Sequence, residues 1–150
     1  MKKRALLSSL LVVLLPVATS ALADTPAAAA TGLGQSWPAA TDVSSSGHFR
    51  VYVFERAGVR YVQVNDLDGK VRGAFGVVGG QVFALPMGLD ATRLATPADT
   101  TPAPAAQGGE VVYRSDDMQV IAYPQPSGDL LLRAIQGECK DPMECNIHLQ

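Results

Sequence analysis

Three two-residue turn signals, each between runs of alternating residues, constrain this chain more than any other feature. The turns are Ala57-Gly58, Asp68-Gly69 and Gly79-Gly80, and the residues between them alternate with a period of two. Asp-Gly and Gly-Gly pairs favour tight hairpins because both central residues of a type I′ turn need positive φ. The sequence therefore predicts a four-stranded antiparallel meander over residues 48–56, 59–66, 71–78 and 81–85.

The turns also predict which residues face one another, because a two-residue loop sets the register of its strands. On one face the expected row is Val53, Val62, Phe75 and Ala84. On the other face, one row contains Phe54, Tyr61, Gly76 and Phe83, and its neighbour contains Tyr52, Gln63, Ala74 and Leu85. Both faces are apolar, so one is expected to form the core. The other is covered by the C-terminal strands, self-associated or used for binding.

Shorter strands are expected after the meander. Residues 110–114 and 118–123 flank a turn-like Ser-Asp-Asp, residues 129–135 follow a Pro- and Gly-containing turn, and residues 146–149 form a last short strand. No segment after residue 23 shows helical periodicity. The prediction is an all-β fold, in which the meander forms part of a small sandwich or open barrel of about seven or eight strands.

The first 23 residues have the three parts of a cleaved secretory signal peptide. Residues 2–4 are basic, residues 5–15 are apolar, and Ala21-Leu22-Ala23 supplies a small-residue cleavage site. The apolar run is too short to cross ~30 Å of hydrocarbon. We therefore expect a periplasmic or secreted protein with no membrane span after signal cleavage.

Removal of the leader changes the charge balance of the chain. Three of the 12 basic residues and none of the 14 acidic residues precede position 24, so 9 basic residues remain against 14 acidic ones, a net charge of −5. Nucleic-acid binding is disfavoured, because phosphates require clustered Lys and Arg.

Two segments of low complexity divide the rest of the chain. Residues 24–47 are rich in Ala, Thr, Ser, Pro and Gly, and are expected to form a flexible, disordered spacer whose Trp37 docks onto the domain. Residues 92–109 are rich in Pro and Ala and are expected to form a long mobile loop. The remaining chain, residues 48–150, is expected to be a single β domain.

The residues that most often carry chemistry form no familiar pattern. In an oxidising compartment, Cys139 and Cys145 are expected to form a disulfide. A redox pair or soft-metal site is disfavoured because five residues separate them instead of two. His48 and His148 lack the spacing of a metal site, and no serine lies in a nucleophile elbow. We therefore predict no catalytic residue, metal or cofactor.

The candidate binding site is the aromatic face of the meander. Tyrosine and arginine are typical of recognition surfaces because they combine a large apolar area with a polar tip. The predicted site comprises Tyr52, Phe54, Tyr61 and Phe83, with Gln63 between them and Arg50 and Arg72 at the margin.

The leading hypothesis is an exported, non-enzymatic binding or inhibitor-like module of the bacterial envelope, which presents this face to an envelope or secreted protein. One alternative is a small periplasmic hydrolase or metal-dependent enzyme built from scattered Asp and His residues. Another is a structural or assembly subunit that self-associates by adding strands at exposed sheet edges.

Overall fold

The computed structural model describes residues 29–100 and 108–137. These residues form eight β-strands and one short 3-10 helix, so the predicted all-β class is confirmed. Within the same ranges, no helix is long and apolar enough to cross a membrane. The predicted leader, the predicted disulfide of Cys139 and Cys145, His148 and the predicted last strand at residues 146–149 lie outside the described residues.

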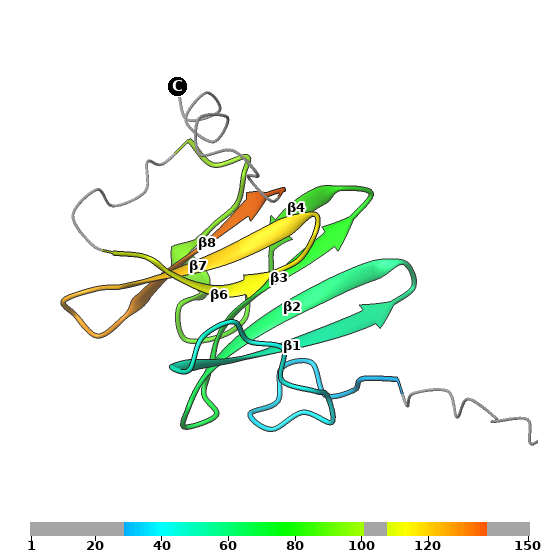
Figure 1. Cartoon of the computed structure of the whole chain (residues 1–150), viewed down its shortest axis with the longest axis horizontal. Helices are drawn as coiled ribbons and strands as arrows, with labels where there is room; N and C mark the ends of the chain where they lie inside the picture. Colours follow the sequence, from blue (N-terminus) through cyan, green and yellow to red (C-terminus); the bar gives the residue numbers. More distant parts are fainter. Residues whose placement is uncertain (1–28, 101–107, 138–150) are drawn as a thin grey trace, which may run out of the picture.

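The first sheet is the predicted meander (Figure 1). Its strands are β1 (Phe49–Arg56), β2 (Val59–Asp66), β3 (Val71–Val78) and β4 (Gln81–Ala84), in that spatial order. The expected pairs of Val53 with Val62, Val62 with Phe75, and Phe75 with Ala84 are all present. The predicted register is therefore confirmed up to Val64. Beyond it a bulge pairs Asn65 with Val71.

The second sheet has the strand order β5-β8-β7-β6. Strands β6 (Glu110–Arg114), β7 (Met118–Pro124) and β8 (Leu130–Gln136) are antiparallel and match the expected segments. Strand β5 (Leu94–Ala95) runs parallel to β8 and follows the 3-10 helix η1 (Ala91–Arg93).

Strand β5 lies inside the stretch that the sequence predicts as a loop. Leu94 occupies the space that a side chain at Gly73 would fill, since a Cβ at Gly73 would lie 2.5 Å from a Leu94 methyl carbon. Leu94 is also paired with Leu132 of β8. A tertiary contact, not local periodicity, therefore orders this part of the stretch.

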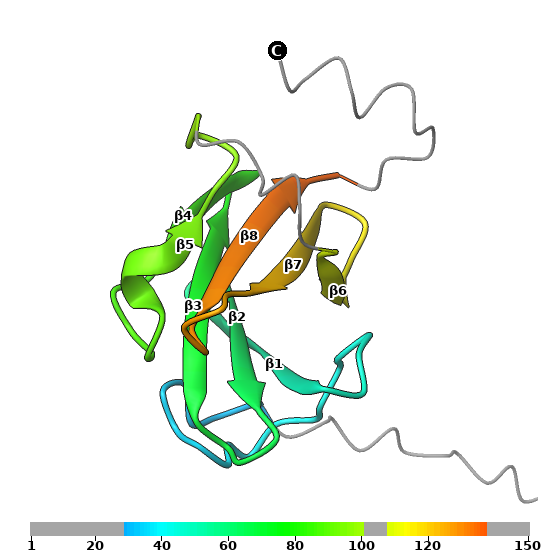
Figure 2. The same ribbon diagram turned by 90° about the vertical axis from the view of Figure 1, so that its left-hand side faces the viewer.

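The two sheets face each other, and their inner sides form the core (Figure 2). The meander contributes its valine-rich face, and the second sheet contributes alternate residues of β7 and β8 together with the adjacent Val112 and Tyr113 of β6. The fully or nearly buried core residues are Phe49, Val51, Val62, Val64, Phe75, Val77, Val112, Tyr113, Met118, Val120, Ala122, Leu130, Leu132 and Ala134. The aromatic side of the meander consequently faces away from the second sheet.

Candidate functional site

The aromatic side of the meander, called here the outer face, is largely covered. Tyr52 and Phe54 are only 5% and 4% exposed, and Gln63 is fully buried. Tyr61 is half-buried, whereas Phe83 is 40% exposed. The C-terminal strands do not provide this cover, because they pack on the opposite side. Part of the cover comes from residues 31–39, which are bonded to Gln63 and Asn65 of β2 and lie on the side of β1 and β2 away from β7 and β8 (Figure 1).

Residues 31–39, named here the N-terminal strap, are held to β2 by two buried side-chain amides. Gln63 Nε2 donates to the Gln35 carbonyl at 2.9 Å, and Gln63 Oε1 accepts from the Gly34 N–H at 2.6 Å. Asn65 Nδ2 donates to the Ser36 carbonyl at 2.9 Å. A bridge between Thr31 and Ala39 closes the strap on itself. This differs from the expected flexible spacer.

The sequence does contain a signal for the strap. Gln63 and Asn65 alternate with apolar residues along a strand whose outer face is otherwise aromatic, and both are fully buried. Buried amides require hydrogen-bond partners, and their own strand already uses its backbone groups in the sheet. A covering segment with free backbone groups satisfies them.

Trp37 lies at the end of the strap and docks on the β2–β3 turn, as expected. Its indole packs on Gly69, where a Cβ would lie 2.7 Å from two ring atoms. The guanidinium carbon of Arg50 lies 5.7 Å from the ring centroid, within the range of a cation–π contact. Although it is fixed on two sides, Trp37 remains 60% exposed.

Asp42 holds Arg50 beside the indole. Its Oδ2 lies 3.4 Å from Arg50 Nη1, and its Oδ1 accepts from the backbone N–H groups of Val51 at 2.9 Å and Ser44 at 3.0 Å. Burial raises the pKa of Asp42, but these hydrogen bonds and the charge of Arg50 outweigh it and bring the pKa below its ordinary value. The carboxylate therefore stays ionised at neutral pH and pairs with Arg50.

Arg72 does not belong to the outer face, so its predicted place at the margin of the site is wrong. The bulge after Val64 pairs Asn65 with Val71 and removes Arg72 from the position opposite Asn65. The Arg72 guanidinium contacts Asp90 at 2.6 Å, Asp66 at 3.5 Å and the Gly128 carbonyl at 3.3 Å. These contacts join β3 to two loops, which is a structural role.

Phe83 lies at the other end of the outer face from Trp37. Its ring covers Gly76, where a Cβ would lie 2.1 Å from the ring. Gly76 pairs with Tyr61, whereas Trp37 lies on the turn that follows β2. The predicted site is thus divided into an exposed Trp37–Arg50 end and an exposed Phe83 end, with the strap between them.

Exposed apolar side chains gather around the first sheet. In residues 29–100 and 108–137, the large apolar residues with substantial exposure are Leu33, Trp37, Val43, Leu67, Val78, Phe83 and Leu89. All belong to the meander, its turns or the segments beside it, and none comes from β6, β7 or β8. The outer face of the second sheet also has apolar residues, including Ile121 and Leu131, but these are half-buried.

A second polar group joins residues near the start of β1 to β6. Glu110 accepts a hydrogen bond from the Ser46 hydroxyl and lies 3.0 Å from His48 Nδ1. These two partners, Ser46 first, lower the pKa of Glu110. In a Ser-His-carboxylate triad the serine hydroxyl is bonded to the imidazole, but here the hydroxyl and the imidazole are both bonded to the carboxylate. The arrangement therefore differs from a triad and connects the residues before β1 to β6.

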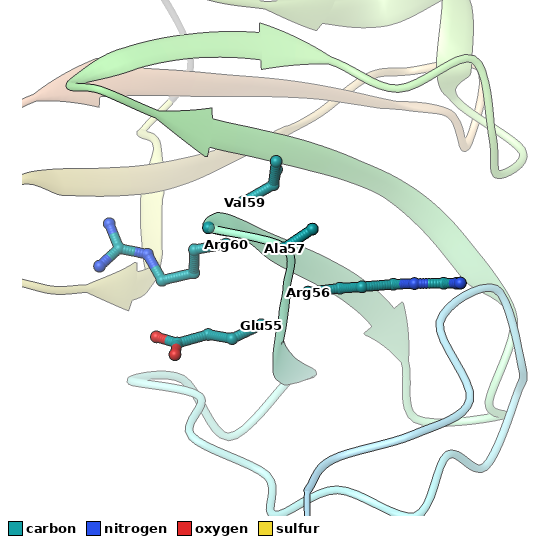
Figure 3. Close-up of a pocket in the computed structure, with 6 residues that line it drawn as sticks. Glu55, Arg56, Ala57, Val59 and Arg60 are labelled. Carbon is teal, nitrogen blue, oxygen red and sulfur yellow. The ribbon is translucent and has the colours of Figure 1, made fainter.

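The β1–β2 turn borders a hollow of about 360 Å³, lined by Glu55, Arg56, Ala57, Gly58, Val59 and Arg60. Figure 3 shows the Glu55 and Arg60 side chains on one side of the turn and the Arg56 side chain on the other. Arg60 is also paired with Asp117. The charged groups do not converge on one point. In the described part of the chain, no three His, Cys, Asp or Glu residues are placed to hold a metal ion.

Comparison of the chain with protein-family models, with curated proteins and with solved structures finds no match. Functional inference for this domain therefore rests on the geometry of its outer face.

Proposed function

We propose that this chain is an exported, non-enzymatic binding module that uses the Trp37–Arg50 end of its outer face to bind a protein partner. The observation that supports this proposal is the state of Trp37, the chain's one tryptophan. It is 60% exposed and yet held between Gly69 and Arg50.

An exposed but fixed tryptophan suits protein recognition for an energetic reason. Ordering a side chain on binding costs conformational entropy, and a ring that is already held in place loses less of it. Tryptophan and arginine are also enriched among the residues that contribute most to binding energy. Leu33, which belongs to the same strap as Trp37, is also exposed and adds apolar area to that segment.

The positions of the predicted residues reduce the binding site expected from the sequence. Tyr52, Phe54 and Gln63 are buried, so they are not contact residues in this proposal. Arg50 stays in the site, and Trp37 becomes its centre. Export is proposed from the leader-like first 23 residues and places the partner in the periplasm or outside the cell.

The proposal is tested by capture from envelope fractions with three forms of the purified protein: wild type, Trp37→Ala and Leu89→Ala. Leu89 is 65% exposed and serves as a matched apolar control. Wild type and Leu89→Ala should retain the same partner. Loss of a hot-spot tryptophan should weaken its binding at least about tenfold. Equal affinity of Trp37→Ala, with an unchanged circular dichroism spectrum, would rule this surface out.

A further inference from the structure

We infer that the free edge of β4 pairs with β4 of a second copy of this chain, forming an antiparallel two-fold dimer through Val82, Phe83 and Ala84. This surface is separate from the Trp37–Arg50 end, and the inference does not depend on the proposed function.

The hydrogen-bond pattern identifies which groups of β4 point outward. Leu85, the residue that follows β4, donates its N–H to the Ala74 carbonyl of β3 at 2.9 Å. Leu85 and Ala74 are therefore a hydrogen-bonded pair of the antiparallel ladder. Such pairs alternate along an antiparallel ladder, so positions 81, 83 and 85 bond towards β3. The N–H and C=O groups of Val82 and Ala84 consequently point away from the sheet. Among the described residues, neither takes part in a backbone hydrogen bond beyond the ladder.

The two edge strands of the first sheet differ in whether another segment covers them. At the β1 edge, Val43 N donates to the Val51 carbonyl and Ser45 N donates to the Val112 carbonyl, both at 2.8 Å. Residues 43–45 therefore cover β1 and connect it to β6. At the other end of the strand order, β4 has no comparable covering segment within residues 29–100 and 108–137.

The sequence of β4 does not prevent edge pairing. Natural edge strands are protected by charged residues, proline or bulges. The four residues of β4, Gln-Val-Phe-Ala, contain neither a charge nor a proline, and they pair with β3 without a bulge. Phe83 is 40% exposed on the outer side of this strand, and Ala84 is also exposed.

A second copy fits this edge because the outward groups complement themselves under a two-fold rotation. When Val82 pairs with Ala84 of the second copy, the reciprocal pair forms as well, and the two pairs make four backbone hydrogen bonds. In this register the two Phe83 residues face each other at a non-hydrogen-bonded position on the outer side. Aromatic cross-strand pairs are favourable there. The two meanders would form one continuous eight-stranded sheet.

Other registers use the edge less well. A shift of one residue would place Phe83 beside residues that face the core side, because side chains alternate along a strand. A shift of two residues in one direction brings Val82 opposite Pro86, which has no N–H to donate. A shift of two in the other direction pairs Ala84 with Gly80 of the turn, outside the strand.

The first test compares the molar mass of purified wild type, Ala84→Pro and Ala84→Ser by light scattering over a concentration series. Proline removes the outward N–H without touching the bonds to β3, whereas serine keeps it. Wild type and Ala84→Ser should be dimers, and Ala84→Pro should be a monomer with an unchanged circular dichroism spectrum. A wild-type monomer at every concentration, or a folded Ala84→Pro dimer, would overturn the inference.

A second test remains decisive if Ala84→Pro fails to fold. Facing residues in a non-hydrogen-bonded pair have Cβ atoms about 4.5–5.5 Å apart, close enough for a disulfide after a small adjustment. Phe83→Cys should form a dimer linked from position 83 to position 83 under mild oxidation, as mapped by peptide mass spectrometry. Val78→Cys, exposed in the same hairpin, should not. Absence of the 83–83 link would overturn the inference.

Different variants test the dimer and the proposed binding function, so either proposal can be contradicted without the other. Trp37→Ala should lose partner capture and remain a dimer, whereas Ala84→Pro should become a monomer and retain capture through Trp37. If Trp37→Ala also became a monomer, the contact would lie at the Trp37 end, and the β4 inference would be wrong.

Discussion

The backbone N–H of Gly34 donates to the side-chain oxygen of Gln63 over 2.6 Å, and this bond joins the N-terminal strap to the middle of β2. The Gln63 amide is fully buried and also donates to the Gln35 carbonyl. One side chain thus satisfies both a donor and an acceptor of the strap.

Replacing Gln63 with leucine should therefore release the strap. The variant keeps the side-chain volume but leaves the Gly34 N–H and the Gln35 carbonyl without partners unless the strap moves into water. We expect the free energy of unfolding in urea to fall by about 1–3 kcal/mol. We also expect faster proteolytic cleavage within residues 31–39. Gln81→Ala, at an exposed glutamine, is the control. Unchanged cleavage of Gln63→Leu would contradict this role of the amide.

Gly69 forms the β2–β3 turn and also supports the Trp37 ring. Comparing Gly69→Ala with Gly58→Ala should separate the loss of ring packing from the backbone strain of the turn. Gly69 has a φ of +83°, and a Cβ there would lie 2.7 Å from the indole. Gly58 has a φ of +77° with no atom near its Cβ position. Gly58→Ala should therefore cost about 1 kcal/mol from backbone strain alone.

Gly69→Ala should cost more than Gly58→Ala and shift the tryptophan fluorescence to longer wavelength, because the ring is displaced into solvent. Thermal unfolding and emission spectra of the two variants provide the measurement. If their stabilities and spectra were equal, the indole would not be resting on Gly69.

The parts of the fold that local sequence determines were predictable, and the parts that depend on distant contacts were not. Each turn of the meander is specified by its own two residues, so the pairing from Val53 to Ala84 follows from local chemistry. Strand β5 has only two residues and depends on Leu132, 38 positions away from Leu94 along the chain. No periodic signal reveals such a short strand.

The candidate site was predictable to a similar extent. The alternation placed Tyr52, Phe54, Tyr61, Gln63 and Phe83 on one face, but it could not show that the strap covers part of it. The bulge at Asn65 was also hidden. The Asn65 side chain bonds to the Ser36 carbonyl and the Gly69 carbonyl, so its environment depends on the strap and on the turn. Arg72 was misplaced for this reason.

Acidification should weaken the contact between β6 and the residues that precede β1. Hydrogen bonds from Ser46 and then His48 lower the pKa of Glu110 in the folded state. A lowered folded-state pKa gives stability that is fully present above the unfolded value, about 4.3, and is lost as the pH falls through the folded value. We expect the free energy of unfolding to decrease below about pH 5.

Comparison with Glu110→Gln isolates this carboxylate from Asp42, Asp99 and Asp117, whose pKa values are also lowered. The variant should be less stable at neutral pH, and its stability should fall less steeply between neutral and acidic pH. Urea unfolding at a series of pH values gives the free energy of unfolding of wild type and Glu110→Gln as a function of pH. Parallel curves for the two proteins would show that Glu110 does not contribute.

Asp90 and Arg72 form the most buried ion pair of the described residues, and removing the Asp90 carboxylate should strongly lower the free energy of unfolding. The Asp90 side chain is 1% exposed and that of Arg72 is 14% exposed. Asp90 also accepts a hydrogen bond from Leu130 N at 2.8 Å. Asp90→Ala leaves the Leu130 N–H without its acceptor and leaves the largely buried Arg72 guanidinium with the longer contacts to Asp66 and the Gly128 carbonyl. The expected loss is about 3–5 kcal/mol in the free energy of unfolding.

The pair of Arg93 with Asp129 supplies the matched comparison for Asp90→Ala. Its N–O distance is 2.9 Å, but its side chains are 43% and 37% exposed. Solvent screens such a pair, so Arg93→Ala should cost no more than about 1 kcal/mol. Chemical denaturation of both variants measures the contrast. Since Asp90 connects β3 to the start of β8, a loss in Asp90→Ala as small as that in Arg93→Ala would mean that the core alone holds the two sheets in register.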